Sequence, residues 1–328
     1  MKSNTNTKLI LFHPSITSKS AATAATHHRL WFFFFLSFFT IAFSLTLFSS
    51  SLHSSSSSSS SASSASPSFP PHVAAALLHY AAVSASNSSM SLSELSAVSA
   101  AVRSVSGRNL LVFGLSHESL LWRSINFAGR TVFVDENSYA VSKFEQANPG
   151  VEAYDVVFST RVSQAGELLR YYRTQHECRP VQNLLFSDCK LGINDLPNFV
   201  YETDWDVILV DGPSGFSGES PGRMSAIFTA AVLARSKRDV KSKKKTDVFV
   251  HEFGRKVERV YSEEFLCKEK LVEVVGELAH FSVAAEEGGA GSPEEVMFCR
   301  NSKGLSENFA PVTGGDDEDG GVESVDDD

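Results

Sequence analysis

Several signatures of familiar enzymes are missing from this sequence. Its 328 residues contain no P-loop, no HExxH sequence and no GxSxG elbow, which argues against the common kinases, metalloproteases and serine hydrolases. Cysteine is scarce, at four residues, and no pair has CxxC or zinc-finger spacing. We therefore expect no metal site. One or two disulfides are plausible in an oxidising compartment, with buried free thiols as the alternative.

Charged side chains are absent between Arg29 and Glu94. Within that gap, residues 30–48 (LWFFFFLSFFTIAFSLTLF) form an apolar run long enough to span a bilayer. A cleaved signal peptide is the alternative, although its apolar stretch is usually shorter and closer to the start. The charged residues before the run are all basic, so the positive-inside rule predicts a single-pass type II membrane protein with residues 1–29 in the cytosol.

Low-complexity segments border the remaining sequence. Residues 49–72 are rich in serine and cannot bury enough apolar surface to fold, so we predict a flexible stalk. Residues 301–328 end in an acidic, glycine-rich sequence that is also predicted to be disordered. This tail holds most of the formal net charge of −9, which therefore says little about the folded part. The folded domain is predicted to cover residues 73–300.

Nothing in the sequence suggests nucleic-acid binding. The basic run Lys237–Lys245 lies between two predicted elements, and we interpret it as a solvated loop. Contact with a polyanion is the alternative.

Short apolar runs alternate with helical patterns across this domain. The runs at 109–113, 131–134, 207–210 and 248–250 predict strands, and the unbroken Val207–Val210 run is typical of a strand buried on both faces. Ser91 and Glu94 form a capping box at the start of one helix, and Pro221 is expected to begin another. The alternation predicts an α/β fold with a mostly parallel, doubly wound sheet.

Glycine or acidic residues follow the first two predicted strands. Gly114 would allow a ligand to approach the backbone closely. Asp135 and Glu136 begin 21 residues later, where nucleotide-binding α/β folds bind ribose hydroxyls. We predict that these three residues bind a cofactor; the alternative for Asp135 is a cap for the next helix.

Asp211 and His251 follow the other two strands and are the candidate catalytic pair. At the carboxyl edge of a doubly wound sheet they would face one crevice, where they could orient a substrate hydroxyl and accept its proton. His251 is the better candidate base because its unperturbed pKa is near neutrality. A turn cap for Asp211 and a structural hydrogen bond for His251 are the alternatives. Asp188 could also reach the crevice as a cofactor ligand, with an ordinary loop as the alternative.

A single glycine in place of GxGxxG fits an adenosine-bearing cofactor that lacks a pyrophosphate. S-adenosylmethionine is the candidate. Methyl transfer to a hydroxyl needs the acceptor held in line with the methyl group, with a base or metal to take the proton. The sequence does not decide whether a divalent metal takes part.

Longer segments resemble a known plant family. NLLVFGLSHESLLW, GRTVFVDEN, DWDVILVDGPSG and PGRMSAIFTAAVLARSK are similar to the plant polysaccharide-biosynthesis domain family. That family contains the glucuronoxylan 4-O-methyltransferases and the irregular-xylem xylan-biosynthesis proteins. The opening TKLILFHPSI and the apolar run resemble the irregular-xylem branch.

The resemblance implies a Rossmann-like methyltransferase fold in a type II Golgi membrane protein with a lumenal domain. It implies a role in xylan synthesis, with glucuronoxylan or its precursors as partners. For the methyltransferase branch the implied reaction is methyl transfer from S-adenosylmethionine to the 4-hydroxyl of glucuronic acid side chains. For the irregular-xylem branch the implied role is that of a non-catalytic subunit that supports other xylan-synthesis proteins. Gly114, Asp135 and Glu136 would serve the cofactor, and Asp211 would face the reaction centre.

Overall fold

The computed structural model describes residues 33–41, 69–84, 90–238, 244–286 and 297–299. The chain divides into two compact units, residues 1–64 and 65–328. In the first unit residues 33–41 form a helix with exposed side chains. No helix in the described ranges is long and apolar enough to cross a membrane. The rest of the predicted span at 30–48 lies outside these ranges, as do most of the predicted stalk and the whole acidic tail.

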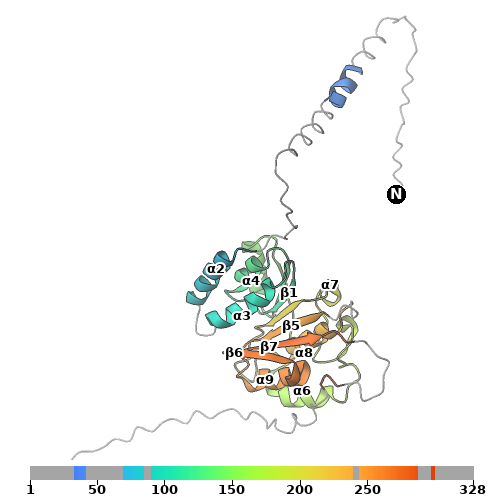
Figure 1. Ribbon diagram of the computed structural model, residues 1–328. Coiled ribbons are helices and arrows are strands. Elements are labelled where there is room, and N and C mark those ends of the chain that lie inside the picture. Colours follow the sequence, from blue (N-terminus) through green and yellow to red (C-terminus); the bar gives the residue numbers. More distant parts are fainter. Residues whose placement is uncertain (1–32, 42–68, 85–89, 239–243, 287–296, 300–328) are drawn as a thin grey trace, which may run out of the picture. The chain divides into compact units, whose positions relative to one another are not determined.

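The second unit is built on a seven-stranded sheet (Figure 1), whose strand order is β3-β2-β1-β4-β5-β7-β6. Neighbours from β3 to β5 are parallel, and β7 runs antiparallel to both β5 and β6. The prediction of a mostly parallel α/β sheet is confirmed, and the arrangement is consistent with a Rossmann-like fold. The strands are β1 (Asn109–Phe113), β2 (Arg130–Asp135), β3 (Glu152–Asp155), β4 (Val207–Val210), β5 (Lys245–Val250), β6 (Leu271–Val275) and β7 (Leu278–Ala284).

Helices cover both faces of the sheet. Because side chains alternate along a strand, Leu110 and Val112 of β1 join one core cluster while Leu111 and Phe113 join the other. The first cluster packs against α2 (Pro71–Val83), α3 (Leu92–Arg103), α4 (Ser119–Ile125) and α5 (Ser138–Ala147). The second packs against α6 (Ala165–Tyr172), α7 (Asn198–Glu202), α8 (Met224–Arg235) and α9 (Lys256–Ser262). The shorter helical turns are η1 (Val162–Gln164), η2 (Leu184–Phe186), η4 (Glu263–Cys267) and η5 (Lys268–Lys270).

Helix starts were predicted with mixed success. The capping box of α3 is present: the Ser91 hydroxyl accepts from the Glu94 N–H, and the Glu94 carboxylate accepts from the Ser91 N–H at 2.5 Å. However, α2 begins two residues before the predicted domain start, at Pro71. The prediction that α8 begins at Pro221 is wrong. Gly222 has φ +71°, a left-handed conformation that a helix excludes, so α8 begins at Met224.

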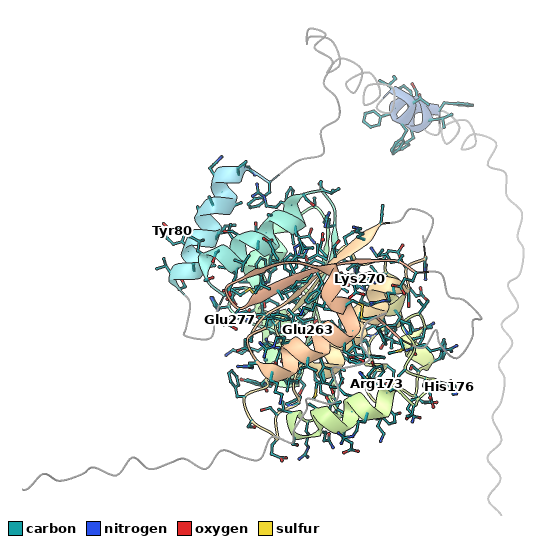
Figure 2. All side chains as sticks on the ribbon, turned by 60° about the horizontal axis from the view of Figure 1, so that its bottom comes forward. Tyr80, Arg173, His176, Glu263, Lys270 and Glu277 are labelled. Carbon is teal, nitrogen blue, oxygen red and sulfur yellow. A yellow bond between two sulfur atoms is a disulfide. The ribbon has the colours of Figure 1, made fainter. Side chains whose placement is uncertain are left out.

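Glu94 also joins the first part of the domain to its last strands. Its Oε1 atom accepts a hydrogen bond of 2.6 Å from the backbone N–H of Glu277, in the turn between β6 and β7 (Figure 2). The turn in turn accepts from the loop after β5, where the N–H of Phe253 donates to the Glu277 carbonyl at 2.8 Å. The start of α3, this hairpin and the β5 loop are therefore tied together.

All four cysteines form disulfides, Cys178–Cys189 and Cys267–Cys299. The interpretation of the basic run as a solvated loop is wrong for its first residue. Lys237 is buried, its Nζ donates to the Lys245 carbonyl at 3.4 Å, and burial lowers its pKa. Residues 239–243 of the run lie outside the described ranges.

Candidate functional site

The ends of four adjacent strands lie in register at one edge of the sheet. Phe113 of β1 pairs with Val134 of β2 on one side and with Val210 of β4 on the other, and Val210 pairs with Val250 of β5. The residues that follow these four are Gly114, Asp135, Asp211 and His251. The strand order reverses between β1 and β4, and such switch points are where open α/β sheets bind ligands.

Gly114 and Gly212 bring the two central loops into close contact. Gly114 has φ +105°, and a Cβ on it would lie 2.8 Å from the Gly212 nitrogen. A Cβ on Gly212 would lie 2.6 Å from the Gly114 Cα. Both contacts are too short for any side chain, so this pair of glycines lets the backbones after β1 and β4 touch.

Asp135 ties β2 to the loop after β1. Its Oδ2 accepts from the Leu115 N–H at 2.7 Å and its Oδ1 from the Asn137 N–H at 2.8 Å. Burial raises the pKa of Asp135, and these two backbone bonds offset the rise only in part. The α5 cap is Asn137, whose Oδ1 accepts from the Ala140 N–H at 3.0 Å. Neither the helix cap nor a free ribose ligand therefore describes Asp135.

Glu136 is the exposed carboxylate of the two. Its Oε1 accepts from the Ser214 N–H at 3.1 Å, which joins the β2 end to the loop after β4. Since Asp135 uses both of its oxygens in the backbone, Glu136 is the carboxylate that a ligand at this edge can reach.

Asp211 and His251 form a hydrogen-bonded pair. Asp211 Oδ1 lies 2.7 Å from His251 Nδ1, and His251 is buried. Burial lowers the pKa of His251, but the hydrogen bond to Asp211 and its negative charge outweigh burial and raise this pKa above its ordinary value. When Nδ1–H donates to Asp211, the neutral ring presents Nε2 as its acceptor. An imidazole oriented by a carboxylate is a suitable general base.

Arg223 holds the two loops of this pair in place. Its guanidinium donates to the Asp211 carbonyl at 3.0 Å and also to the His251 carbonyl, and it is buried. It forms an ion pair with Glu252 at 2.6 Å. Glu252 has φ +59°, an unusual backbone conformation for a residue with a side chain, and its carboxylate also pairs with Arg255 at 2.6 Å. The sequence analysis missed all three residues, although a charged residue at the start of the apolar α8 was a visible signal.

Comparison with known proteins decides the family. The chain matches the IRX15/IRX15L/GXM family model over residues 93–281. It belongs to the IRX15/IRX15L/GXM family. The Arabidopsis thaliana Protein IRX15-LIKE is 49% identical, with 92% of this chain and 95% of the relative covered. Protein IRREGULAR XYLEM 15 of the same plant is 48% identical over 85% of this chain and 90% of its own length.

A named methyltransferase is also similar. Glucuronoxylan 4-O-methyltransferase 1 of Arabidopsis thaliana is 37% identical, with 70% of this chain and 80% of the relative covered. No solved structure matches significantly. The segment that matches the IRX15/IRX15L/GXM model contains every candidate site residue named above, whereas α2 lies before it.

Asp188 is not brought to the strand ends in this family member. It is exposed and follows Ser187 beside the Cys178–Cys189 disulfide. The surrounding segment packs along α8, where Ile193 N donates to Thr229 Oγ1 at 3.1 Å. Within the described ranges we find no contact between Asp188 and the Asp211–His251 pair, so its cofactor role stays a prediction without geometric support.

The described ranges contain one group of three potential metal ligands, Cys267, Glu269 and Cys299. Both sulfur atoms belong to a disulfide, so this group is not a metal site. The roles predicted for the other candidates stay predictions, but four of the five strand-end residues now have a defined hydrogen-bonding or packing task.

Proposed function

We propose that the protein acts in xylan biosynthesis as an O-methyltransferase. Its substrates would be S-adenosylmethionine and the 4-hydroxyl of glucuronic acid side chains in glucuronoxylan. Relatives named for irregular xylem and for glucuronoxylan methylation support the pathway. The observation that carries the reaction is the Asp211–His251 pair at the switch point of the sheet.

The residues at this edge fit the cofactor. Gly114 leaves the backbone after β1 bare, and Glu136 offers an exposed carboxylate at the β2 end for ribose hydroxyls. The order with one antiparallel strand, β7, also suits the methyltransferase-type sheet that the family implies. When bound, S-adenosylmethionine supplies a methyl group on a positively charged sulfur.

The chain's own residues would manage the proton of the acceptor hydroxyl. His251 Nε2 takes that proton, and the Asp211 carboxylate stabilises the imidazolium that forms. Arg223 keeps both residues in register through their backbone carbonyls. General-base action of this kind contributes roughly a hundredfold to ten-thousandfold in rate.

The location is proposed to be the Golgi membrane, with residues 65–328 in the lumen and a single type II anchor at 30–48. The apolar run and its basic flank support this orientation. Both disulfides fit an oxidising compartment.

A second candidate function is a non-catalytic subunit of a xylan-synthesising complex. The specific observation in its favour is similarity: identity is 49% to IRX15-LIKE but 37% to a relative named as a methyltransferase. A scaffold would keep the sheet and its core while losing the need for a free base.

Binding of the cofactor separates the two functions. We would titrate the full-length purified chain with S-adenosylmethionine and S-adenosylhomocysteine in a calorimeter. In parallel we would measure transfer of radiolabelled methyl to xylo-oligosaccharides that carry glucuronic acid. Saturable binding together with transfer is the expected result. Absence of binding at millimolar cofactor would reject the enzyme and leave the scaffold.

A further inference from the structure

An exposed aromatic ring lies on the loop after β4. Phe216 is 73% exposed, and the guanidinium carbon of Arg255 lies 4.4 Å from the centre of its ring. Single exposed apolar side chains are common and need no explanation. Phe216 differs because a cation holds one face of the ring, leaving the rest of the ring to solvent.

This loop is anchored on both sides. Ser214 N donates to Glu136 Oε1 at 3.1 Å on the β2 side, and Ser163 N donates to the Gly218 carbonyl at 2.9 Å. On the β5 side Gly215 packs against α9, where a Cβ on it would lie 3.2 Å from Glu258 Oε1. The ring is therefore presented by a fixed loop, which lowers the entropy cost of binding through it.

Contacts run without a break from the ring to the proposed base. Arg255 pairs with Glu252 at 2.6 Å, and the same Glu252 oxygen pairs with Arg223 at 2.6 Å. Arg223 in turn binds the Asp211 carbonyl at 3.0 Å. A ligand on Phe216 would thus rest on the same network that positions the Asp211–His251 pair.

The charge of this network favours an anion. One Glu252 oxygen serves two guanidinium groups, and Asp211 is occupied by His251. Burial raises the pKa of the adjacent Glu258, which favours its neutral form. Arg255 is partly exposed and has more N–H donors than Glu252 can accept.

We infer that Phe216 and Arg255 form the subsite for the acceptor sugar, an acidic pyranose. The C–H face of the sugar ring would pack on the negative face of the Phe216 ring, and its carboxylate would bind Arg255. This inference rests on the proposed function, because it identifies how the same site would select a uronic acid. Asp211 and His251 handle the proton, whereas these two residues would determine which sugar reaches them.

Direct binding of oligosaccharides tests the subsite separately from methylation. We would titrate the full-length chain with a xylo-oligosaccharide that carries one glucuronic acid branch, and with the same oligosaccharide without the branch. Phe216→Leu should weaken the branched ligand about tenfold, since an aromatic contact of this kind is worth roughly one factor of ten. Arg255→Gln should abolish the preference for the branched ligand.

Phe186→Leu is the matched control, because Phe186 is 79% exposed but belongs to the segment near Asp188. It should bind the branched ligand like the original chain. Equal affinity of the Phe216→Leu and Phe186→Leu variants, or no binding by the original chain, would overturn the subsite. Affinity for S-adenosylhomocysteine, measured on the same samples, reports on the proposed function instead and should be unchanged by Phe216→Leu.

Discussion

The Nδ1 atom of His251 lies 2.7 Å from Oδ1 of Asp211, and Arg223 binds the backbone carbonyls of both residues. This pairing gives His251 a defined tautomer and ring orientation. It also raises its pKa despite burial, so the ring stays protonated to a higher pH than a free histidine, whose pKa is about 6.5.

Methyl transfer should therefore increase with pH through the raised pKa of His251, because only the neutral ring accepts a proton. Asp211→Asn removes the charge that raises this pKa, so the midpoint of the pH–rate profile should move to lower pH. The maximal rate should fall by about a hundredfold or more. A variant with an unchanged midpoint would show that His251 is not the titrating base.

The same shift predicts a stability effect that does not need activity. A raised folded-state pKa contributes stability that is fully present below the unfolded pKa of about 6.5, and this stability is lost as pH rises through the folded pKa. Asp211→Asn should thus destabilise the protein more at pH 6 than at pH 9. Thermal melts of the variant and the original chain at both pH values would measure this, and equal losses would contradict it.

The two carboxylates at the β2 end should behave differently. Glu136→Gln should weaken S-adenosylhomocysteine binding about tenfold while leaving the melting temperature nearly unchanged, because the side chain is exposed. Asp135→Ala should cost about 1–3 kcal/mol in the free energy of unfolding, since two backbone N–H groups lose their partner. Calorimetry and denaturant unfolding would test both, and the opposite pattern would reassign the ribose ligand to Asp135.

Gly114→Ala should disrupt the contact between the two central loops. Its Cβ would lie 2.8–3.0 Å from backbone atoms of Asp211 and Gly212, in addition to the strain of φ +105°. Gly150→Ala is the matched control, because Gly150 has φ +85° and open space around its missing Cβ. The control should lose about 1 kcal/mol in the free energy of unfolding. Gly114→Ala should lose clearly more and should also lose cofactor binding, and similar losses in the two variants would show that the close approach is unimportant.

The strand ends were predictable because chain order and parallel pairing fix which residues meet at the carboxyl edge. Four apolar runs were enough to place Gly114, Asp135, Asp211 and His251 together. The hairpin of β6 and β7 was not predicted, because β6 is an exposed edge strand whose sequence LVEVV shows no clean alternation.

The support around the pair was also beyond prediction. Arg223 meets Glu252 only because Glu252 adopts a left-handed backbone conformation and the loop before α8 turns at Gly222. Such contacts depend on the path of two loops, which periodicity does not encode. For Asp188, an acidic residue after an apolar run had the same local pattern as Asp135, but its run forms a helical turn rather than a strand.

The bond between Glu94 and Glu277 spans 183 residues of chain. During synthesis, the first helix of the domain would leave the ribosome long before its partner in the β6–β7 turn exists. The carboxylate would then have only Ser91 to cap, and the β5 loop with His251 would lack the turn that holds Phe253. The order of translation thus places the completion of the candidate site at the very end of folding, so a chain that stops short of the hairpin would carry all of its candidate residues without the frame that aligns them.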